Sequence, residues 1–300
     1  MKLALGTVQF GLNYGISNQD GQVPSEQVKE ILALAHESGI DTLDSAAAYG
    51  TSEQCIGDIE LSQPFNIVTK IPTIDQNVTD IRPYVDNSLR LLKRDTLEGL
   101  LFHDIDSILA HPNKKELCRQ LVELKSQRRV KRVGISVYQP KQISNALDEF
   151  EFDLVQAPVN TFDQRFIQPD IIQMLTRHKL KLHTRSAFLQ GLLLMPQGSW
   201  PSYFAPYSTL LDRFSIMAKQ LQVSNLTLAL AFMVHNSLNE SNADNAEVLE
   251  KIVVGCCSSI QLAEIIESYQ AAIAIKLPSD IWQQFASNEQ ALINPAQWSV

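Results

Sequence analysis

The chain has 300 residues, of which 45% are hydrophobic and 19% are charged, and its formal net charge at pH 7 is −8. These values are ordinary for a globular protein and exclude wholesale disorder, and an acidic chain is a poor general binder of nucleic acid. The apolar run 226–234 is one of the longest, well short of the roughly 20 residues that cross a bilayer. The N-terminus MKLALGTVQFG lacks an extended apolar segment, so we expect neither a signal peptide nor a membrane anchor.

The four cysteines indicate a reducing compartment. They are Cys55, Cys118, Cys256 and Cys257, and no two of them form a CxxC pair. This pattern excludes a secreted disulfide framework and a zinc site. We therefore expect reduced thiols, a cytoplasmic protein and no metal. The role of the adjacent pair Cys256 and Cys257 stays open.

Eight short apolar runs indicate strands, and several of them are rich in β-branched residues. Such runs are typical of a parallel sheet that is buried on both faces. The predicted strands are Leu3–Gly6, Thr42–Asp44, Asn66–Lys70, Gly99–Phe102, Arg132–Ser136, Leu154–Ala157, Lys181–Arg185 and Ile252–Cys256.

Helical patterns separate these runs. In the segment 24–39, Val28, Ile31, Leu32 and Ala35 follow the spacing of one helix face. The segments 79–93 and 113–128 repeat this pattern. Alternating strands and helices predict a parallel sheet with right-handed crossovers. We expect a single-domain (β/α)8 TIM barrel over residues 1–300, with elaborated loops at its C-terminal face. A doubly wound open sheet remains the alternative.

Polar side chains stand where three neighbouring strands end. Asp44 and Lys70 end the second and third predicted strands, His103 follows the fourth, and Tyr49 lies in the loop after the second. In a TIM barrel, the carboxyl ends of the strands carry the active site. Any one of these residues alone fits loop capping, but all four in adjacent units favour a catalytic site.

These four residue types suit hydride transfer to a carbonyl, because the negative charge that develops on oxygen needs a proton donor. Tyr49 could donate, although the reference pKa of tyrosine is about 10. The ammonium of Lys70 would lower that pKa, and Asp44 would neutralise the buried lysine. A neutral His103 could donate to the carbonyl oxygen and orient it.

Three segments carry a resemblance to a known family. IDTLDSAAAYGTSEQCIG, NIVTKIP and SLRLLKRDTLEGLLFHDID resemble successive signatures of the aldo-keto reductase superfamily, and the resemblance extends from LALGTVQFG to residue 268. It implies an NAD(P)(H)-dependent oxidoreductase that reduces an aldehyde or ketone to an alcohol. It also implies a tetrad of Asp44, Tyr49, Lys70 and His103, with Tyr49 as the general acid.

The family binds its dinucleotide without a Rossmann motif, and this sequence has no G-x-G-x-x-G. By resemblance, Ser136 and Gln156 hold the nicotinamide carboxamide, while Val137 replaces an asparagine. Arg185 replaces an aromatic residue that stacks on the nicotinamide. A guanidinium could stack in the same way or pair with a carboxylate, and both interpretations stay open.

The segment VVGCCSSIQLAEIIES resembles the family's adenosine-binding loop and helix, but it lacks a basic residue for a 2′-phosphate. Ser258 and Ser259 could bind phosphate or merely cap the helix. Lys251 precedes the predicted strand, so we expect it at the opposite end of the barrel. The expected cofactor-binding residues are Gly6, Thr7, Ser136, Gln156, Arg185, Ser186, Phe188, Gly255, Ser258, Ser259, Gln261 and Glu264.

The resemblance favours NADP(H) over NAD(H) and a small carbonyl or alcohol substrate, with no nucleic-acid or membrane partner. The natural substrate and the oligomeric state stay open. Aromatic residues in the segment 196–210 could bind a substrate ring or pack on the barrel. Two other functions remain: a cofactor-binding regulatory subunit with little turnover, and a TIM-barrel lyase or isomerase that forms a Schiff base on Lys70.

Overall fold

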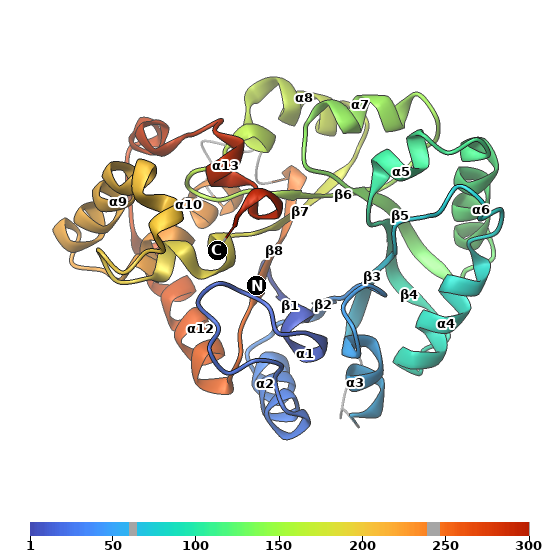
Figure 1. Ribbon diagram of the computed structural model, residues 1–300, viewed down its shortest axis with the longest axis horizontal. Coiled ribbons are helices and arrows are strands. Elements are labelled where there is room, and N and C mark those ends of the chain that lie inside the picture. The colour runs from blue at the N-terminus through green and yellow to red at the C-terminus, as the bar shows by residue number, and fades with distance from the viewer. Residues whose placement is uncertain (60–64, 239–246, 300) are drawn as a thin grey trace.

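The computed structural model describes residues 1–59, 65–238 and 247–299. Eight parallel strands form a closed barrel in chain order, and the last strand pairs with the first (Figure 1). The strands are β1 (Leu3–Gly6), β2 (Thr42–Asp44), β3 (Asn66–Ile71), β4 (Leu97–Phe102), β5 (Val130–Ser136), β6 (Leu154–Pro158), β7 (Lys181–Arg185) and β8 (Leu249–Gly255). The predicted TIM barrel is confirmed, because the closed order excludes a doubly wound open sheet.

Helices surround the barrel (Figure 1). The α-helices are α1 (Val8–Gly11), α2 (Ser25–Glu37), α3 (Ser52–Asp58), α4 (Arg82–Leu92), α5 (Ile105–Leu109), α6 (Lys114–Ser126), α7 (Lys141–Leu147), α8 (Pro169–Arg177), α9 (Ser208–Gln220), α10 (Asn225–Leu238), α12 (Ser259–Ala274) and α13 (Gln290–Ile293). The 3-10 helices are η1 (Arg165–Ile167), η2 (Leu189–Leu194), η3 (Ser202–Tyr207), η5 (Ser279–Phe285) and η6 (Pro295–Gln297). In the described parts of the chain, no helix combines the length and apolar character that a membrane crossing requires.

The barrel interior is filled by side chains rather than open. Val68, Leu101 and Leu154 form their own buried cluster, separate from the larger core under the helices. Glycines on β4 and β5 leave the room for it. A Cβ atom on Gly134 would lie 2.1 Å from the Leu154 carbonyl oxygen, and one on Gly99 would lie 3.3 Å from Val68. This packed interior supports the polar groups above it.

The outer layer follows the predicted periodicity. Val28, Ile31, Leu32 and Ala35 of α2 are all fully buried, as one helix face against the barrel requires. Helix α12 packs against both α2 and α10 (Figure 1). The N-terminus of α12 is thereby fixed beside the carboxyl end of β8.

The eighth strand begins earlier than predicted, at Leu249 rather than Ile252. Glu250 and Lys251 interrupt the apolar run at the start of this strand. The barrel accommodates their charges because each side chain has a charged partner. Lys251 therefore lies within β8 and not before it. Its ammonium contacts Asp41 Oδ1 at 2.5 Å, just before β2, so the predicted position at the amino-terminal end of the barrel is right.

The aromatic segment 196–210 packs against the C-terminal part of the chain. The Phe204 ring meets Trp298 edge to face with centroids 4.9 Å apart, and the Tyr203 hydroxyl donates to the Ala291 carbonyl at 2.9 Å. Trp200, Tyr203, Phe204 and Tyr207 do not line the large cavity at the carboxyl end of the strands. The structure thus favours the packing interpretation over a substrate-binding one.

Candidate active site

A buried ion pair lies at the carboxyl ends of β2 and β3. Lys70 Nζ is 2.8 Å from Asp44 Oδ2 and also donates to the Ser45 carbonyl at 2.7 Å. The lysine side chain is fully buried, and the aspartate side chain is 5% exposed. An ammonium has three N–H donors, so two are engaged and one remains for the Tyr49 side.

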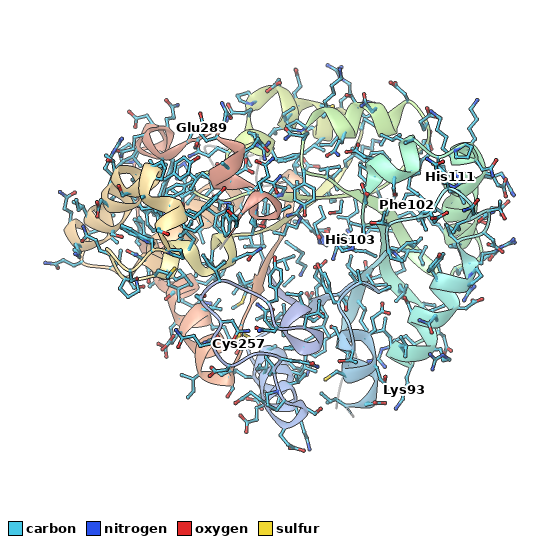
Figure 2. The ribbon with its side chains drawn as sticks, in the orientation of Figure 1. Lys93, Phe102, His103, His111, Cys257 and Glu289 are labelled. Carbon is cyan, nitrogen blue, oxygen red and sulfur yellow. The ribbon has the colours of Figure 1, made fainter. Side chains whose placement is uncertain are left out.

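Tyr49 and His103 meet above this ion pair. Lys70 Nζ lies 5.1 Å from the Tyr49 ring centroid. The Tyr49 and His103 rings pack edge to face with centroids 5.7 Å apart, and Figure 2 shows His103 near the middle of the molecule. Gly11 makes this geometry possible, because a Cβ atom there would lie 1.8 Å from the Tyr49 carbonyl oxygen. The structure therefore brings together the four side chains that the sequence singled out.

Burial and charge set the protonation of this group. Burial raises the pKa of Tyr49, and the nearby Lys70 charge acts in the opposite direction. The expectation of a lowered tyrosine pKa was therefore incomplete, because it left out burial. For Lys70, burial lowers the pKa, but the charges of Asp44 and Tyr49 outweigh it and the net pKa is raised. Burial, followed by the charges of Lys70 and Arg185, lowers the pKa of His103 to about 4, so the imidazole is neutral at pH 7.

A second buried carboxylate stands behind the tetrad, and the sequence reasoning missed it. Glu53 accepts hydrogen bonds from Thr69 Oγ1 at 2.6 Å and from Ser88 Oγ at 3.1 Å. Burial raises its pKa, while these two hydroxyls and the charge of Lys70 oppose the shift. Glu53 closely follows Tyr49 in the segment AYGTSE. This short separation from Tyr49 is the sequence feature that could have indicated a place near the site.

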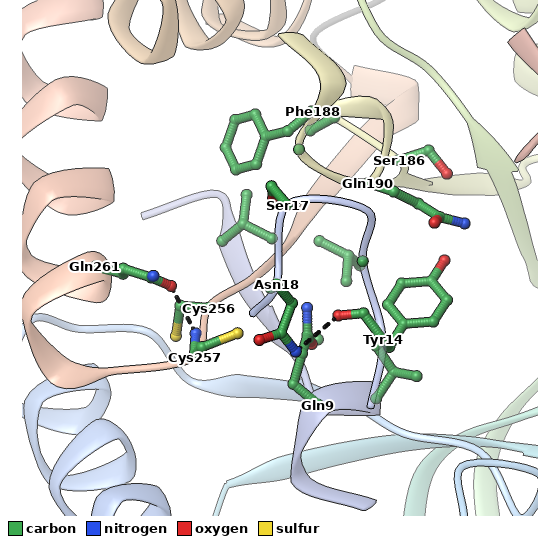
Figure 3. A pocket seen from close by; sticks show the side chains of 18 of the residues that line it. Gln9, Tyr14, Ser17, Asn18, Ser186, Phe188, Gln190, Cys256, Cys257 and Gln261 are labelled. Carbon is green, nitrogen blue, oxygen red and sulfur yellow. Dashed lines mark hydrogen bonds between the residues drawn. The ribbon is translucent and has the colours of Figure 1, made fainter. Parts of the chain in front are cut away.

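A cavity of about 630 Å³ opens beside the tetrad. Asp44, Tyr49 and His103 line one part of it, while Lys70 lies beneath and does not. The other part lies against β8 and α12, where Figure 3 shows the Gln261 amide close to Cys257. Gln261 Oε1 accepts there from the Cys257 backbone N–H at 2.8 Å.

Eight of the expected cofactor residues line this cavity. They are Gly6, Thr7, Arg185, Ser186, Phe188, Gly255, Gln261 and Glu264. Ser136, the last residue of β5, and Gln156, in the middle of β6, are both buried and do not line the cavity. Val137, where the resemblance implied an asparagine, is fully buried.

The two serines of the last loop also stay outside the cavity lining. Ser258 Oγ accepts from the Gln261 backbone N–H at 3.1 Å and caps α12. Ser259 Oγ instead contacts α2, where it donates to Glu30 Oε2 at 3.1 Å. Capping is therefore the role that the structure gives to Ser258, and contact between helices is the role of Ser259.

Among the described residues, Arg185 contacts an aromatic ring and two uncharged acceptors rather than the carboxylate that one of the two interpretations required. Its guanidinium carbon lies 4.1 Å from the Tyr138 ring centroid. It donates to the Val137 carbonyl at 3.2 Å and to Ser186 Oγ at 3.4 Å. No carboxylate in the described parts of the chain forms an ion pair with it. Tyr138 was not among the predicted site residues, and only the folded loop after β5 brings it here.

The cavity has features that fit a nicotinamide dinucleotide. Gln9 Oε1 in its wall is buried and has no hydrogen-bond partner among the described residues, so an acceptor is left for a ligand donor. A Cβ atom on Gly255 would lie 2.7 Å from Gln9 Nε2, so a larger residue there would displace the Gln9 amide from this wall. Gln156 Oε1, buried nearby, also has no partner in the described chain. Unpaired amide acceptors are suitable for a carboxamide or ribose hydroxyls.

The loop between α1 and α2 closes one side of the cavity, and the sequence reasoning did not foresee it. Tyr14 and Asn18 line the wall, and Asn18 Nδ2 donates to the Tyr14 carbonyl at 3.2 Å (Figure 3). The loop lies against η2, where a Cβ atom on Gly191 would be 1.9 Å from Ser17 Oγ. Burial, above all, raises the pKa of Tyr14 to about 12. The loop has no periodic pattern, so only its tertiary contacts reveal its place.

Comparison with known proteins agrees with this geometry. The family model of the aldo/keto reductase family matches residues 2–287, which is nearly the whole chain. The chain belongs to the aldo/keto reductase family. It is accordingly an oxidoreductase of the aldo-keto reductase type. A search of curated proteins finds no match.

Solved structures of other aldo-keto reductases share the fold. The holo form of an aldo-keto reductase from Bacillus halodurans is 19% identical with a TM-score of 0.70, over 99% of this chain and 94% of that one. The glycerol dehydrogenase of Gluconobacter oxydans is 20% identical with a TM-score of 0.70, over 94% and 89%. An aldo-keto reductase from Klebsiella pneumoniae in complex with NADPH is 18% identical with a TM-score of 0.66, over 100% and 93%.

Proposed function

We propose that this aldo-keto reductase reduces an aldehyde or ketone to the corresponding alcohol, and oxidises the alcohol in reverse, with NADP(H) or NAD(H). The observation that carries the proposal is the ammonium of Lys70, buried against Asp44 and 5.1 Å from the Tyr49 ring centroid. The NADPH complex of the Klebsiella pneumoniae relative supports the choice of a nicotinamide cofactor.

Tyr49 is the proposed general acid. When bound, the reduced nicotinamide supplies a hydride to the carbonyl carbon. Tyr49 Oη gives its proton to the carbonyl oxygen as negative charge develops there. Burial makes the phenol reluctant to ionise, and Lys70 reduces that reluctance. Asp44 keeps the lysine charged in a buried site.

His103 is the proposed orienting residue. It is neutral at pH 7, because burial and two neighbouring cations lower the pKa to about 4. A neutral imidazole can donate one N–H to the carbonyl oxygen, and edge-to-face packing on Tyr49 places it beside the proton donor. The same oxygen would then accept from both side chains.

The proposed cofactor contacts follow the cavity wall. Gly6, Thr7, Ser186, Phe188, Gly255, Gln261 and Glu264 line it, with Arg185 near the catalytic end. Gln156 and Ser136 would act from just behind the wall, and Ser258 through the N-terminus of α12. A small carbonyl compound and a cytoplasmic location complete the proposal, and the four free cysteines support the location.

A Schiff-base reaction at Lys70 is not favoured. A nucleophilic lysine needs a neutral amine, whereas the neighbours of Lys70 raise its pKa. A purely regulatory subunit is not favoured either, because all four catalytic side chains are in contact with the cavity or with one another.

A dinucleotide titration followed by a carbonyl panel tests the proposal. We expect quenching of protein fluorescence by NADPH and NADH, and consumption of the reduced cofactor with aromatic and aliphatic aldehydes. Binding without turnover of any carbonyl or alcohol would support the regulatory alternative. A covalent adduct on Lys70 after borohydride trapping would support the Schiff-base alternative.

A further inference from the structure

Arg185 is the only lysine or arginine that lines the cavity within the described residues. Among the described residues it donates to two acceptors, the Val137 carbonyl at 3.2 Å and Ser186 Oγ at 3.4 Å, and both are uncharged. A guanidinium carries five N–H donors, so most of them have no acceptor among the described residues. A partly buried cation without a carboxylate is unusual, because burying charge without a partner is unfavourable.

The guanidinium is held in place. Its carbon lies 4.1 Å from the Tyr138 ring centroid, so a cation–π contact restrains it. Arg185 also ends β7 and pairs in register with Pro158 of β6. A stacked guanidinium at a strand end is preorganised, so it loses little conformational entropy when it binds a further group.

The charge of Arg185 acts on the catalytic end of the cavity. It contributes to the lowered pKa of His103 and opposes the raised pKa of Tyr14 and Tyr49. The other cation at this end, Lys70, is already neutralised by Asp44 at 2.8 Å. Arg185 therefore leaves a positive potential where the carbonyl would be reduced.

The acidic residues of the cavity do not compensate this potential. Asp44 is committed to Lys70 and Gln156. Glu264 lies on α12, and Asp20 lies near Cys257, where its charge adds to the effect of burial in raising the pKa of that thiol. Both belong to the other part of the cavity.

We propose that Arg185 binds an anionic group of the substrate, so that this enzyme prefers aldehydes or ketones that carry a carboxylate or a phosphate over neutral ones. The inference rests on the proposed function and names its substrate class. Carboxylate and phosphate oxygens match the fork of N–H donors on the guanidinium edge.

Matched substrates test this preference. The first pair is 4-carboxybenzaldehyde and its methyl ester, which differ in charge at one position. The second pair is glyceraldehyde 3-phosphate and glyceraldehyde, which tests phosphate as the anion. We expect kcat/KM to be about 10–100-fold higher for at least one anionic member, as a charge-assisted contact implies. The pair with the larger ratio identifies the anion.

Two variants and a control assign the effect to Arg185. In Arg185→Gln, the ratio of anionic to neutral kcat/KM should fall by about 10-fold or more, mainly through KM, and Arg185→Lys should keep part of it. Arg213→Gln removes an arginine on α9 that bonds only to Gln284 among the described residues, and the ratio should not change. The dissociation constant of NADPH is measured for each variant.

Several results would overturn the proposal. One is an equal kcat/KM for both members of both pairs in the wild-type enzyme. Another is an Arg185→Gln enzyme with an unchanged ratio but weaker NADPH binding, which would assign the guanidinium to the cofactor alone. If no carbonyl is turned over, the proposed function fails. The anion site can then still be tested by calorimetry, which compares the binding of 4-(hydroxymethyl)benzoate with that of its methyl ester. Binding of the anion alone, lost in Arg185→Gln, would support the anion site without the reaction, and equal binding would overturn it.

Discussion

The amide nitrogen of Gln156 lies 2.6 Å from Oδ1 of Asp44 and donates a hydrogen bond to it. Lys70 engages the other oxygen, Oδ2, at 2.8 Å. Strands β3 and β6 therefore hold one buried carboxylate of β2 from two sides. The sequence resemblance connects Gln156 with the nicotinamide carboxamide. Its amide nitrogen supports the catalytic ion pair, and Oε1 has no partner among the described residues.

Gln156→Leu should destabilise the fold. The substitution leaves Asp44 Oδ1 buried and unpaired, which costs about 1–3 kcal/mol or more because the acceptor is charged. Urea unfolding measures the loss, with the exposed Gln173→Leu on α8 as the matched control. A Gln156→Leu protein as stable as the control would show that the hydrogen bond to Asp44 contributes nothing.

Tyr49→Phe should lower kcat for carbonyl reduction by about 10²–10⁴-fold, the usual range for loss of a general acid. The phenol delivers the proton, while its ring only lines the cavity, so the dissociation constant of the dinucleotide should change little. Stopped-flow turnover and a fluorescence titration measure the two quantities. Tyr84→Phe on α4, outside the cavity lining, is the control. Near-normal turnover by Tyr49→Phe would remove the phenol from the mechanism.

Lys70→Met should reduce turnover and move the pH profile. The ammonium opposes the effect of burial on the pKa of Tyr49, so its removal raises that pKa further. In the reductive direction, activity requires the protonated phenol. The alkaline decline should therefore shift to higher pH while the maximal rate falls. Lys251→Met removes a lysine at the opposite end of the barrel, and its profile should match the wild type. A pH profile for Lys70→Met that coincides with those of the wild type and Lys251→Met would contradict the role of Lys70 beside Tyr49.

His103 should make the fold less stable in mild acid. Its pKa in the folded protein is about 4, below the 6.5 of a free histidine, so between these values the unfolded chain binds a proton that the folded chain does not. The free energy of unfolding therefore falls as the pH drops from 6.5 towards 4. The contribution is on the order of 2 kcal/mol over two pH units. His103→Gln should flatten this part of the pH dependence in urea unfolding, while the exposed His178→Gln should not. If the free energy of unfolding depended on pH equally in His103→Gln and His178→Gln, the contribution of His103 would be contradicted.

The sequence predicted the strands well and the loops poorly, for a physical reason. Strands such as β1 and β2 are short apolar runs whose burial depends on local pattern, and their predicted bounds agree with the structure. The segment 12–24 has no such pattern. Its position depends on the left-handed backbone of η2, where Gly191 has a φ of 94° and adjoins Ser17.

The tetrad and its surroundings show the same division. Each tetrad residue stands at or near a strand end, where barrel geometry alone implies convergence. Ser259 could not be placed in this way. Its hydroxyl has the chemistry of a phosphate ligand, but the packing of α12 on α2 turns it towards Glu30. Tyr138 lies in the loop after β5 and Arg185 ends β7, and their contact depends on side-chain conformations that no sequence pattern specifies.

Cofactor choice is the last prediction, and it depends on charge at the α12 part of the cavity. Cys256, Cys257, Gln261, Glu264 and the nearby Asp20 line this part. Within the described residues it thus offers carboxylates and no lysine or arginine to a 2′-phosphate. A charge-assisted hydrogen bond is worth about 1.5–3 kcal/mol, so its absence should reduce the preference for NADPH by about tenfold or more.

Family membership favours NADPH, and the backbone N–H groups at the start of α12 can recover part of the lost affinity. We therefore expect only a modest preference for NADPH and clear activity with NADH. Titrations of both dinucleotides at low ionic strength measure the two dissociation constants, and Cys257→Arg adds a cation to the cavity wall and should strengthen NADPH binding selectively. A wild-type preference of about a thousandfold or more, near 4 kcal/mol, would mean that a cation already reaches the 2′-phosphate. Arg185 would then be the first residue to test, because no other lysine or arginine lines the described cavity.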